Sequence, residues 1–239
     1  MSIKTRAIDY AHNQDALEGM LAYDSAQSGE RPAVLVAHAW SGRTDFEINI
    51  AKKLALLGYA GIAIDLYGKG VVGSSLEENE KLMSPFVADR PMLQSRLLHI
   101  VDVVKALPEA NPNKIAAIGF CFGGMCVLDI ARTGAPLCSV ASFHGLYTPP
   151  GNTDGNKISA KVAAYHGFGD PMATPDTMVA LGQELTKADA DWQIHAYGQT
   201  AHSFTNPKAN NPDFGTVYSK KASDRSWTSL VEFLAECFS

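Results

Sequence analysis

The sequence has 239 residues, of which 46% are hydrophobic and 19% charged, so it can bury a large core. This composition excludes a disordered or fibrous protein, and we expect one domain over residues 1–239. The 20 Lys and Arg residues against 25 Asp and Glu give a net charge of −5 with no basic run, so nucleic acid is not an expected partner.

The start of the chain and its cysteines narrow the class further. Residues 1–6 lead into charged, alternating sequence, and no later stretch approaches about 18 uninterrupted apolar residues. We therefore expect a cytoplasmic protein with no membrane partner. The four cysteines contain no C-x-x-C pair, so the sequence indicates neither a disulfide framework nor a metal site.

The first half of the chain alternates strands and helices after an opening hairpin. Apolar alternation predicts the hairpin, short apolar runs predict strands buried on both faces, and Thr44 to Glu47 fits a capping box. Residues 66–90 are glycine-rich and then acidic, which indicates an excursion over the edge or top of the sheet, with a flexible loop at residues 68–73 and no apolar helix face at residues 74–81. The expected elements are a hairpin of residues 4–10 and 17–23, strands at 33–37 and 59–64, and helices from Thr44 and from Pro91.

The second half repeats strand–helix units. Such repeats predict an α/β fold with a mostly parallel central sheet and helices on both faces, after the N-terminal antiparallel hairpin. In such sheets, chemistry gathers at the carboxyl ends of the strands. The expected elements are strands at 114–119, 137–143, 162–166 and 192–197, helices at 122–132 and from Pro175, and a final helix with Trp227, Leu230, Leu234 and Phe238 on one face.

Cys121 lies in a glycine-framed turn that joins a strand to a helix. The segment Gly119-Phe120-Cys121-Phe122-Gly123-Gly124 fits a nucleophile elbow with cysteine in place of serine. A thiol at a helix N-terminus favours the thiolate, and the amide of Phe122 would face a developing oxyanion. The alternative is a structural cysteine beside packed glycines, which is the reading we prefer for Cys126, Cys138 and Cys237.

A cysteine nucleophile needs a base and a group that orients the base. His202 lies in a small-residue loop after the last strand and is the expected base, whereas His12, His99, His166 and His195 are expected to be structural or solvated. Asp170, after the strand at 162–166, is the expected orienting carboxylate, and Asp65 and Asp176 are alternatives. Cys121, Asp170 and His202 follow the nucleophile–acid–histidine order of α/β-hydrolases.

These motifs resemble the dienelactone hydrolase family of α/β-hydrolases across nearly the whole chain. The resemblance rests on the elbow, on Ala63-Ile64-Asp65-Leu66-Tyr67, on Gly167-Phe168-Gly169-Asp170 and on Ala201-His202-Ser203-Phe204. It implies a Cys121–His202–Asp170 triad that cleaves an ester or enol-lactone through a thioester intermediate, with no metal or organic cofactor.

Two departures from the family pattern concern the substrate. Ala39 stands where dienelactone-cleaving members have a glutamate beside the nucleophile, and Asn206 stands where they have an arginine that binds a substrate carboxylate. Both changes favour a neutral or bulkier ester over an anionic dienelactone. Because some members hydrolyse phosphotriesters, that chemistry stays open.

Further residues are expected around the pocket. Trp40 is the expected second oxyanion donor, because the corresponding loop supplies one in this fold. Without the neighbouring glutamate, we expect Cys121 to rest as a thiolate paired with protonated His202. Residues expected to line the pocket are His38, Ala39, Tyr67, Phe143, His144 and Asn206.

Two other functions remain as alternatives to a hydrolase. A reactive-thiol protein of the amidotransferase or redox-sensing kind also places cysteine on a strand–helix turn, but the order of Asp170 and His202 speaks against it. A non-catalytic binding protein on the same fold would not need the triad. Gly68 to Gly73 spells G-x-G-x-x-G but lacks the context of a dinucleotide site. We expect a small-molecule partner and a monomer or small homo-oligomer.

Overall fold

The computed structural model describes all 239 residues, and they form two compact units, Met1–Ile118 and Gly119–Ser239. The boundary falls inside a strand, β5 (Ala110–Phe120), two residues before the elbow. Each unit is an α/β arrangement, as the sequence predicts. The single domain over residues 1–239 stays a prediction.

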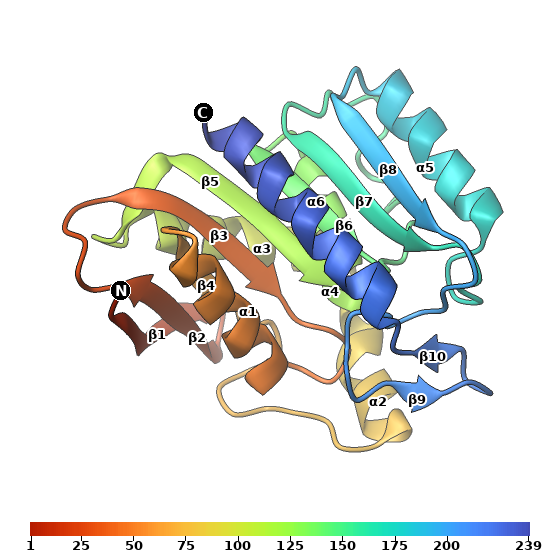
Figure 1. Cartoon of the computed structure of the whole chain (residues 1–239), viewed down its shortest axis with the longest axis horizontal. Helices are drawn as coiled ribbons and strands as arrows, with labels where there is room; N and C mark the ends of the chain where they lie inside the picture. The colour runs from red at the N-terminus through yellow and green to blue at the C-terminus, as the bar shows by residue number, and fades with distance from the viewer. The chain divides into compact units, whose positions relative to one another are not determined.

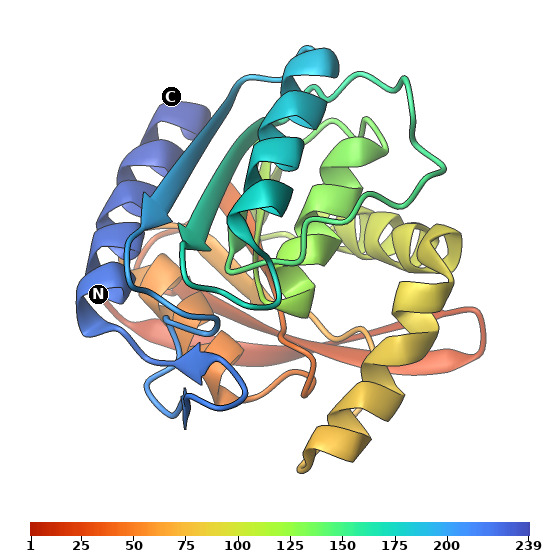
Figure 2. The ribbon, with the colours of Figure 1, turned by 90° about the vertical axis from the view of Figure 1, so that its right-hand side faces the viewer.

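The first unit is built on the opening hairpin and the first parallel pair. Its strands follow the order β1-β2-β4-β3-β5, with β1 antiparallel to β2, β2 antiparallel to β4, and β3 parallel to β4. Helices α1 and α3 lie on opposite faces of these strands (Figures 1 and 2). The elements are β1 Ile3–His12, β2 Asp15–Asp24, β3 Arg31–Ala37, α1 Asp45–Leu56, β4 Ala60–Ala63, α2 Leu76–Ala88 and α3 Arg90–Lys105.

Helix α1 forms where the capping box predicts. The Thr44 side chain accepts a hydrogen bond from the amide of Phe46, and the Glu47 carboxylate accepts one from the amide of Thr44. The helix ends at Leu56, two residues before Gly58, which has φ +91°, a conformation that glycine adopts without strain. Local sequence therefore fixes both ends of this helix.

Helix α2 corrects the sequence expectation for residues 66–90. Residues 76–88 are helical rather than a loop, because Ser75 caps the amide of Glu78 and because Glu77 and Glu78 lie in the first turn, where the helix dipole favours negative charge. The apolar face is too short to give a clear periodicity, and Phe86 is its main buried apolar residue. Gly68 to Gly73 forms a hydrogen-bonded turn that contacts Ala16 and Ser41.

The second unit continues from β5 with β6, β7 and β8, in that order. Strand β6 is parallel to β7, and β7 is parallel to β8. Figures 1 and 2 show α6 on one face of these strands and α4 and α5 on the other. The elements are α4 Phe122–Arg132, β6 Ser139–Phe143, β7 Lys161–Gly167, α5 Pro175–Lys187, β8 Trp192–Tyr197, β9 Asn210–Asn211, β10 Thr216–Val217 and α6 Lys220–Phe238.

The cores of the two units consist mainly of aliphatic side chains from the strands and the facing helices. In the final helix, Leu230, Leu234 and Phe238 are buried as expected, while Trp227 is only half-buried. Cys126 is fully buried, but Cys138 and Cys237 are half-buried, so these two are not plain core residues. No helix is both long and apolar enough to cross a membrane.

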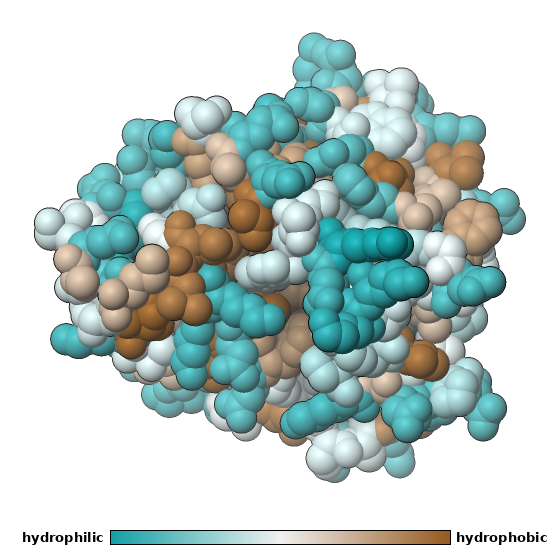
Figure 3. Space-filling view, viewed as in Figure 1, coloured by the Kyte–Doolittle hydropathy of each residue, from teal (hydrophilic) through white to brown (hydrophobic).

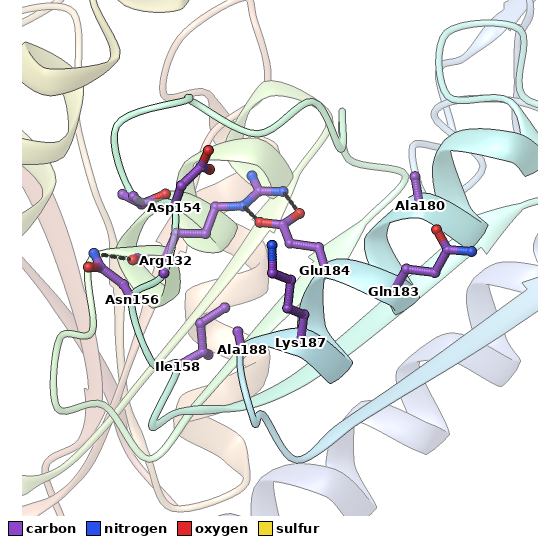
Figure 4. Close-up of a pocket in the computed structure, with 11 residues that line it drawn as sticks. Arg132, Asp154, Asn156, Ile158, Ala180, Gln183, Glu184, Lys187 and Ala188 are labelled. Atoms are coloured by element: carbon purple, nitrogen blue, oxygen red, sulfur yellow. Dashed lines mark hydrogen bonds and ion pairs between the residues drawn. The ribbon is translucent and has the colours of Figure 1, made fainter.

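A buried ion pair joins α4 to α5 in the second unit. The Arg132 guanidinium donates two hydrogen bonds of 2.7 Å to the Glu184 carboxylate, and it also contacts Asp129 and the carbonyl of Tyr147. Figure 4 shows this pair in the wall of a cavity of about 360 Å³, where the Asn156 amide donates to the carbonyl of Arg132. The Arg132 side chain is 2% exposed and that of Glu184 is 28% exposed, so the arginine is shielded from water while the carboxylate stays partly in contact with it.

Removing one partner of this pair is expected to destabilise the fold. Glu184→Ala leaves Arg132 buried with only part of its charge compensated, so we expect the free energy of unfolding to fall by about 3 kcal/mol. Urea denaturation measures this change. In the matched control, Lys157→Ala breaks the exposed Lys157–Asp189 pair and is expected to change it by no more than about 0.5 kcal/mol. Equal effects of the two substitutions would contradict this account.

Candidate active site

Cys121 occupies a strained position between β5 and α4. Its backbone has φ +55° and ψ −115°, which a non-glycine residue rarely adopts. Its amide donates to the carbonyl of Phe143 at 3.0 Å, and its own carbonyl accepts from the amides of Gly124 and Met125 in the first turn of α4. The residue is 9% exposed. These bonds hold the thiol at the N-terminus of α4, as the elbow motif predicts.

The glycines around Cys121 are required by close backbone contacts. A Cβ atom at Gly119 would lie 2.0 Å from the carbonyl oxygen of Gly123, and one at Gly124 would lie 2.7 Å from the Cα atom of Gly145. No side chain can occupy either position without moving the backbone. The strand and the helix therefore approach each other as closely as this turn requires.

His202 and Asp170 meet in a buried hydrogen bond. The Nδ1–H group of His202 donates to Oδ2 of Asp170 at 2.6 Å, and both side chains are almost fully buried. The other oxygen of Asp170 accepts from the amides of Met172 and Ala173. Asp170 is thus both a turn residue and the partner of His202, because each role uses a different carboxylate oxygen.

A short hairpin that the sequence analysis did not single out holds the backbone of His202. The amide of His202 donates to the carbonyl of Gly215, and its carbonyl accepts from the amide of Val217 in β10. Gly215 has φ +76°, and a Cβ atom there would lie 2.2 Å from the Pro171 ring. The sequence feature that could have indicated this hairpin is the turn-forming run before this glycine, Asn210-Asn211-Pro212-Asp213.

The protonation of His202 depends on two opposing effects. Burial alone lowers the pKa of the imidazole, but the Cys121 thiol and the Asp170 carboxylate outweigh it and raise the pKa to about 10. Nε2 is buried and makes no hydrogen bond of good geometry, so Cys121 acts on this ring mainly through charge. The direction of this shift favours the charged imidazole.

His144 packs against His202 and is itself neutral. Its ring lies edge-on to the His202 ring with centroids 5.1 Å apart, and its Nε2 bonds to the Thr205 hydroxyl at 2.8 Å. Burial, followed by the nearby charge of His202, lowers its pKa well below the usual value. Phe143 is fully buried and stacks between Phe120 and Tyr165, so its ring belongs to the core of this unit.

The predicted residues of the first unit form their own network. His38 is fully buried, with Nδ1 donating to the carbonyl of Ala39 and Nε2 accepting from the amide of Leu66. Burial lowers the pKa of His38. The Tyr67 hydroxyl donates to the carbonyl of Trp40 at 3.0 Å, which ties the two loops after β3 and β4 together.

The alternative carboxylates have other positions. Asp65 is buried in the first unit, where it accepts hydrogen bonds from three backbone amides, those of Glu18, Tyr67 and Gly68. These bonds make Asp65 a structural residue of the β4 loop. Asp176 is exposed at the start of α5. Asn206 is half-buried, and its side-chain oxygen accepts from the amide of Lys208.

The remaining polar residues do not form a second centre. His166 is fully buried and contacts the Tyr147 hydroxyl at 3.3 Å, and burial lowers the pKa of this imidazole. His12 and His99 lie together in the first unit, with ring centroids 5.6 Å apart. No group of three or more His, Cys, Asp or Glu side chains is arranged to hold a metal ion.

Comparisons with known proteins show which family the sequence matches. The dienelactone hydrolase family matches residues 17–238. A Salmonella typhimurium protein provisionally named carboxymethylenebutenolidase is 24% identical and covers 93% of this chain and 83% of its own. An uncharacterized protein of Caenorhabditis elegans is 34% identical over 61% of this chain and 94% of its own.

Solved structures extend the same likeness. A dienelactone hydrolase-like promiscuous phosphotriesterase from metagenomic libraries is 34% identical, covers 100% of both chains and has a TM-score of 0.93. A dienelactone hydrolase of Anabaena variabilis is 19% identical, covers 99% of both chains and has a TM-score of 0.72, which bears on the fold alone. The predicted fold class is confirmed.

The glycine contacts at the elbow predict a large loss of stability for Gly119→Ala. The added methyl group would collide with the carbonyl of Gly123, so we expect the free energy of unfolding to fall by more than about 4 kcal/mol. Thermal and urea unfolding measure it. Gly198→Ala is the control, because a Cβ atom there meets nothing within 4 Å. A variant Gly119→Ala as stable as the control would rule out this steric constraint.

The charge on His202 predicts a measurable coupling to Cys121. In Cys121→Ala the largest influence that raises the His202 pKa is gone, so we expect the imidazole to titrate at lower pH than in the wild type. Because the pKa is raised on folding, the wild-type imidazolium stabilises the fold below about pH 6.5 and this contribution is lost as the pH rises through about 10. Proton NMR of the His202 ring against pH measures both titrations, and an unchanged pKa would refute the coupling.

Proposed function

The chain belongs to the dienelactone hydrolase family, a family of ester and lactone hydrolases, and we propose that it uses Cys121 as nucleophile, His202 as proton carrier and Asp170 to orient His202. The observation that carries the proposal is the buried 2.6 Å hydrogen bond from His202 to Asp170. Cys121, which lies on the elbow with a positive φ, raises the pKa of the same imidazole.

The first half of the proposed reaction forms a thioester. The Cys121 thiolate attacks the carbonyl carbon of the substrate, and the C=O electron pair moves onto the oxygen. The amide of Phe122, at the start of α4, donates to this oxyanion. When the oxyanion collapses, the C–O bond to the leaving group breaks, and protonated His202 gives its proton to the departing oxygen. Trp40 stays a prediction for the second oxyanion donor.

The second half restores the enzyme. Neutral His202 removes a proton from water as the water oxygen attacks the thioester carbon. The acid product leaves when the C–S bond breaks, and the sulfur departs as thiolate beside the imidazolium. Asp170 keeps the same ring nitrogen bonded throughout, because its 2.6 Å bond fixes which nitrogen faces the reacting atoms. The resting and final states are therefore the same ion pair.

Two sequence features favour a neutral or bulky ester or lactone as the substrate. A dienelactone carries a carboxylate, and this chain has Asn206 where an arginine would bind it. Ala39 replaces the glutamate that would sit beside the nucleophile. With neither charged group present, charge recognition contributes little to binding, and shape and apolar contact would select the substrate.

Phosphotriester hydrolysis is the second candidate. It is supported by the promiscuous phosphotriesterase that is 34% identical to this chain over its full length. A neutral phosphotriester lacks the carboxylate of a dienelactone, which agrees with Asn206. The same thiolate would attack phosphorus and form the P–S bond of a phosphorylated cysteine as the P–O bond to the leaving group breaks, and protonated His202 would give its proton to the departing oxygen. Neutral His202 would then take a proton from the water that attacks phosphorus, and the P–S bond would break to release the phosphodiester and the thiolate.

Loss of the thiol is expected to abolish ester hydrolysis. With p-nitrophenyl acetate and butyrate, we expect Cys121→Ala and His202→Ala each to lower kcat/KM by at least about a thousandfold, because the residues of a triad act as a unit. Cys138→Ala is the matched control, since Cys138 is a half-buried thiol outside this site, and it should keep wild-type activity. Equal rates for wild type and Cys121→Ala would defeat the assignment.

The substrate class is tested in the same assay. A panel of a neutral aryl ester, a neutral phosphotriester and an anionic dienelactone separates the candidates, and we expect the dienelactone to be the poorest substrate. A wild-type protein that turns over none of the three would speak for a reactive-thiol protein of another class. Efficient cleavage of the dienelactone would show that Asn206 does not exclude anionic substrates.

A further inference from the structure

Strand β8 is an open sheet edge without the usual protection. It ends the strand order, and its residues Trp192–Tyr197 include no Lys, Arg, Asp or Glu. The strand at the other end of the order, β1, carries Lys4, Arg6 and Asp9. Charged side chains are a common means of preventing edge-to-edge pairing, so β1 is protected in this way and β8 is not.

The backbone of β8 presents a defined set of groups at this edge. The carbonyls of Asp191 and Tyr197 accept hydrogen bonds from the amides of Val162 and Phe168, on the β7 side. Because residues alternate along a strand, the N–H and C=O groups of residues 192, 194 and 196 point the other way, where no further strand lies. Three consecutive outward residues can therefore accept another strand.

The side chains of the same three residues form an apolar groove with α5. The groove has a volume of about 650 Å³. The indole of Trp192 lies over Gly182 and donates to the Thr186 hydroxyl, while Val179 on α5 is 54% exposed. Figure 3 shows apolar side chains on the part of the surface formed by β8 and α5, at the upper right. The lining residues are Met178, Val179, Gly182, Gln183, Thr186, Lys187, Trp192, Ile194 and Ala196.

We propose that β8 and the exposed side of α5 pair with the same surface of a second copy of this chain, about a two-fold axis perpendicular to the sheet. The two β8 strands would run antiparallel with Ile194 opposite Ile194. This register places outward backbone groups opposite outward backbone groups, and it sets Trp192, the largest groove residue, opposite Ala196, the smallest side chain of the strand. The surface is thus complementary to itself.

The charges on α5 favour the same arrangement. Because β7 and β8 are parallel, the connecting helix α5 runs antiparallel to them, and a two-fold axis places the two α5 helices antiparallel on one face of the joined sheet. Asp176 lies in the first turn of α5, and Lys187 in the last turn. Each Asp176 then faces the Lys187 of the second copy, with apolar Val179 and uncharged Gln183 between them.

Self-association follows from this complementarity rather than from apolar exposure alone. A strand from an unrelated protein could satisfy the backbone of β8, but it would not bring a helix that fills the groove and reverses the charges of Asp176 and Lys187. A second copy supplies all three features by symmetry.

The mass of the protein in solution tests the pairing. By light scattering across a dilution series, we expect the wild type to have twice the 25.6 kDa of one chain. Ile194→Lys and Val179→Glu are each expected to give the monomer, because each buries an unpaired charge at the seam. Val179→Glu changes only an exposed helix position, so it keeps the test valid if Ile194→Lys folds poorly. Ala7→Lys on β1 is the matched edge-strand control and should leave the mass unchanged.

Charge reversal tests the orientation of the two copies. Asp176→Lys and Lys187→Asp are each expected to raise the dissociation constant of the dimer about fivefold to tenfold, and the double variant is expected to restore it. A wild type that is monomeric at every concentration would overturn the proposal. A dimer that Ile194→Lys and Val179→Glu leave intact, or a double variant no tighter than the single ones, would overturn it as well.

Discussion

The positive φ of Cys121 is the constraint on which the rest of the second unit depends. Such a backbone conformation persists only when its surroundings hold it, and here the hydrogen bond to Phe143 and the close contacts of Gly119 and Gly124 do so. Helix α4 begins at the elbow, and the Arg132–Glu184 ion pair links this helix to α5. Packing and electrostatics together therefore maintain one strained residue.

The electrostatics of His202 show how burial can support a charge. Removing an imidazole from water by itself favours the neutral form, and this is what happens at His144 and His166. His202 differs because its Nδ1–H group bonds to the Asp170 carboxylate and because Cys121 also raises its pKa. Burial thus dominates at His144 and His166, whereas at His202 the effects of Asp170 and Cys121 outweigh it.

Much of the fold and part of the site could be predicted from the sequence, because the decisive signals were local. The elbow glycines and the Thr44 capping box act on neighbouring residues, so their patterns are visible in the chain. Helix α2 was missed because its capping at Ser75 outweighs a weak apolar face. The role of Asp65 could not be read either, since its amide partners come from β2 and the β4 loop, which only the folded chain brings together.

The crowding at the elbow also determines where the protein can change. The contacts at Gly119 and Gly124 leave no space for larger residues. Substitutions at these two glycines are therefore expected to destabilise the fold. Phe168 is half exposed and lies two residues before Asp170, so it is a better position for diversity. Evolution of new specificity would thus be expected to leave the elbow intact and to proceed through the surrounding loops.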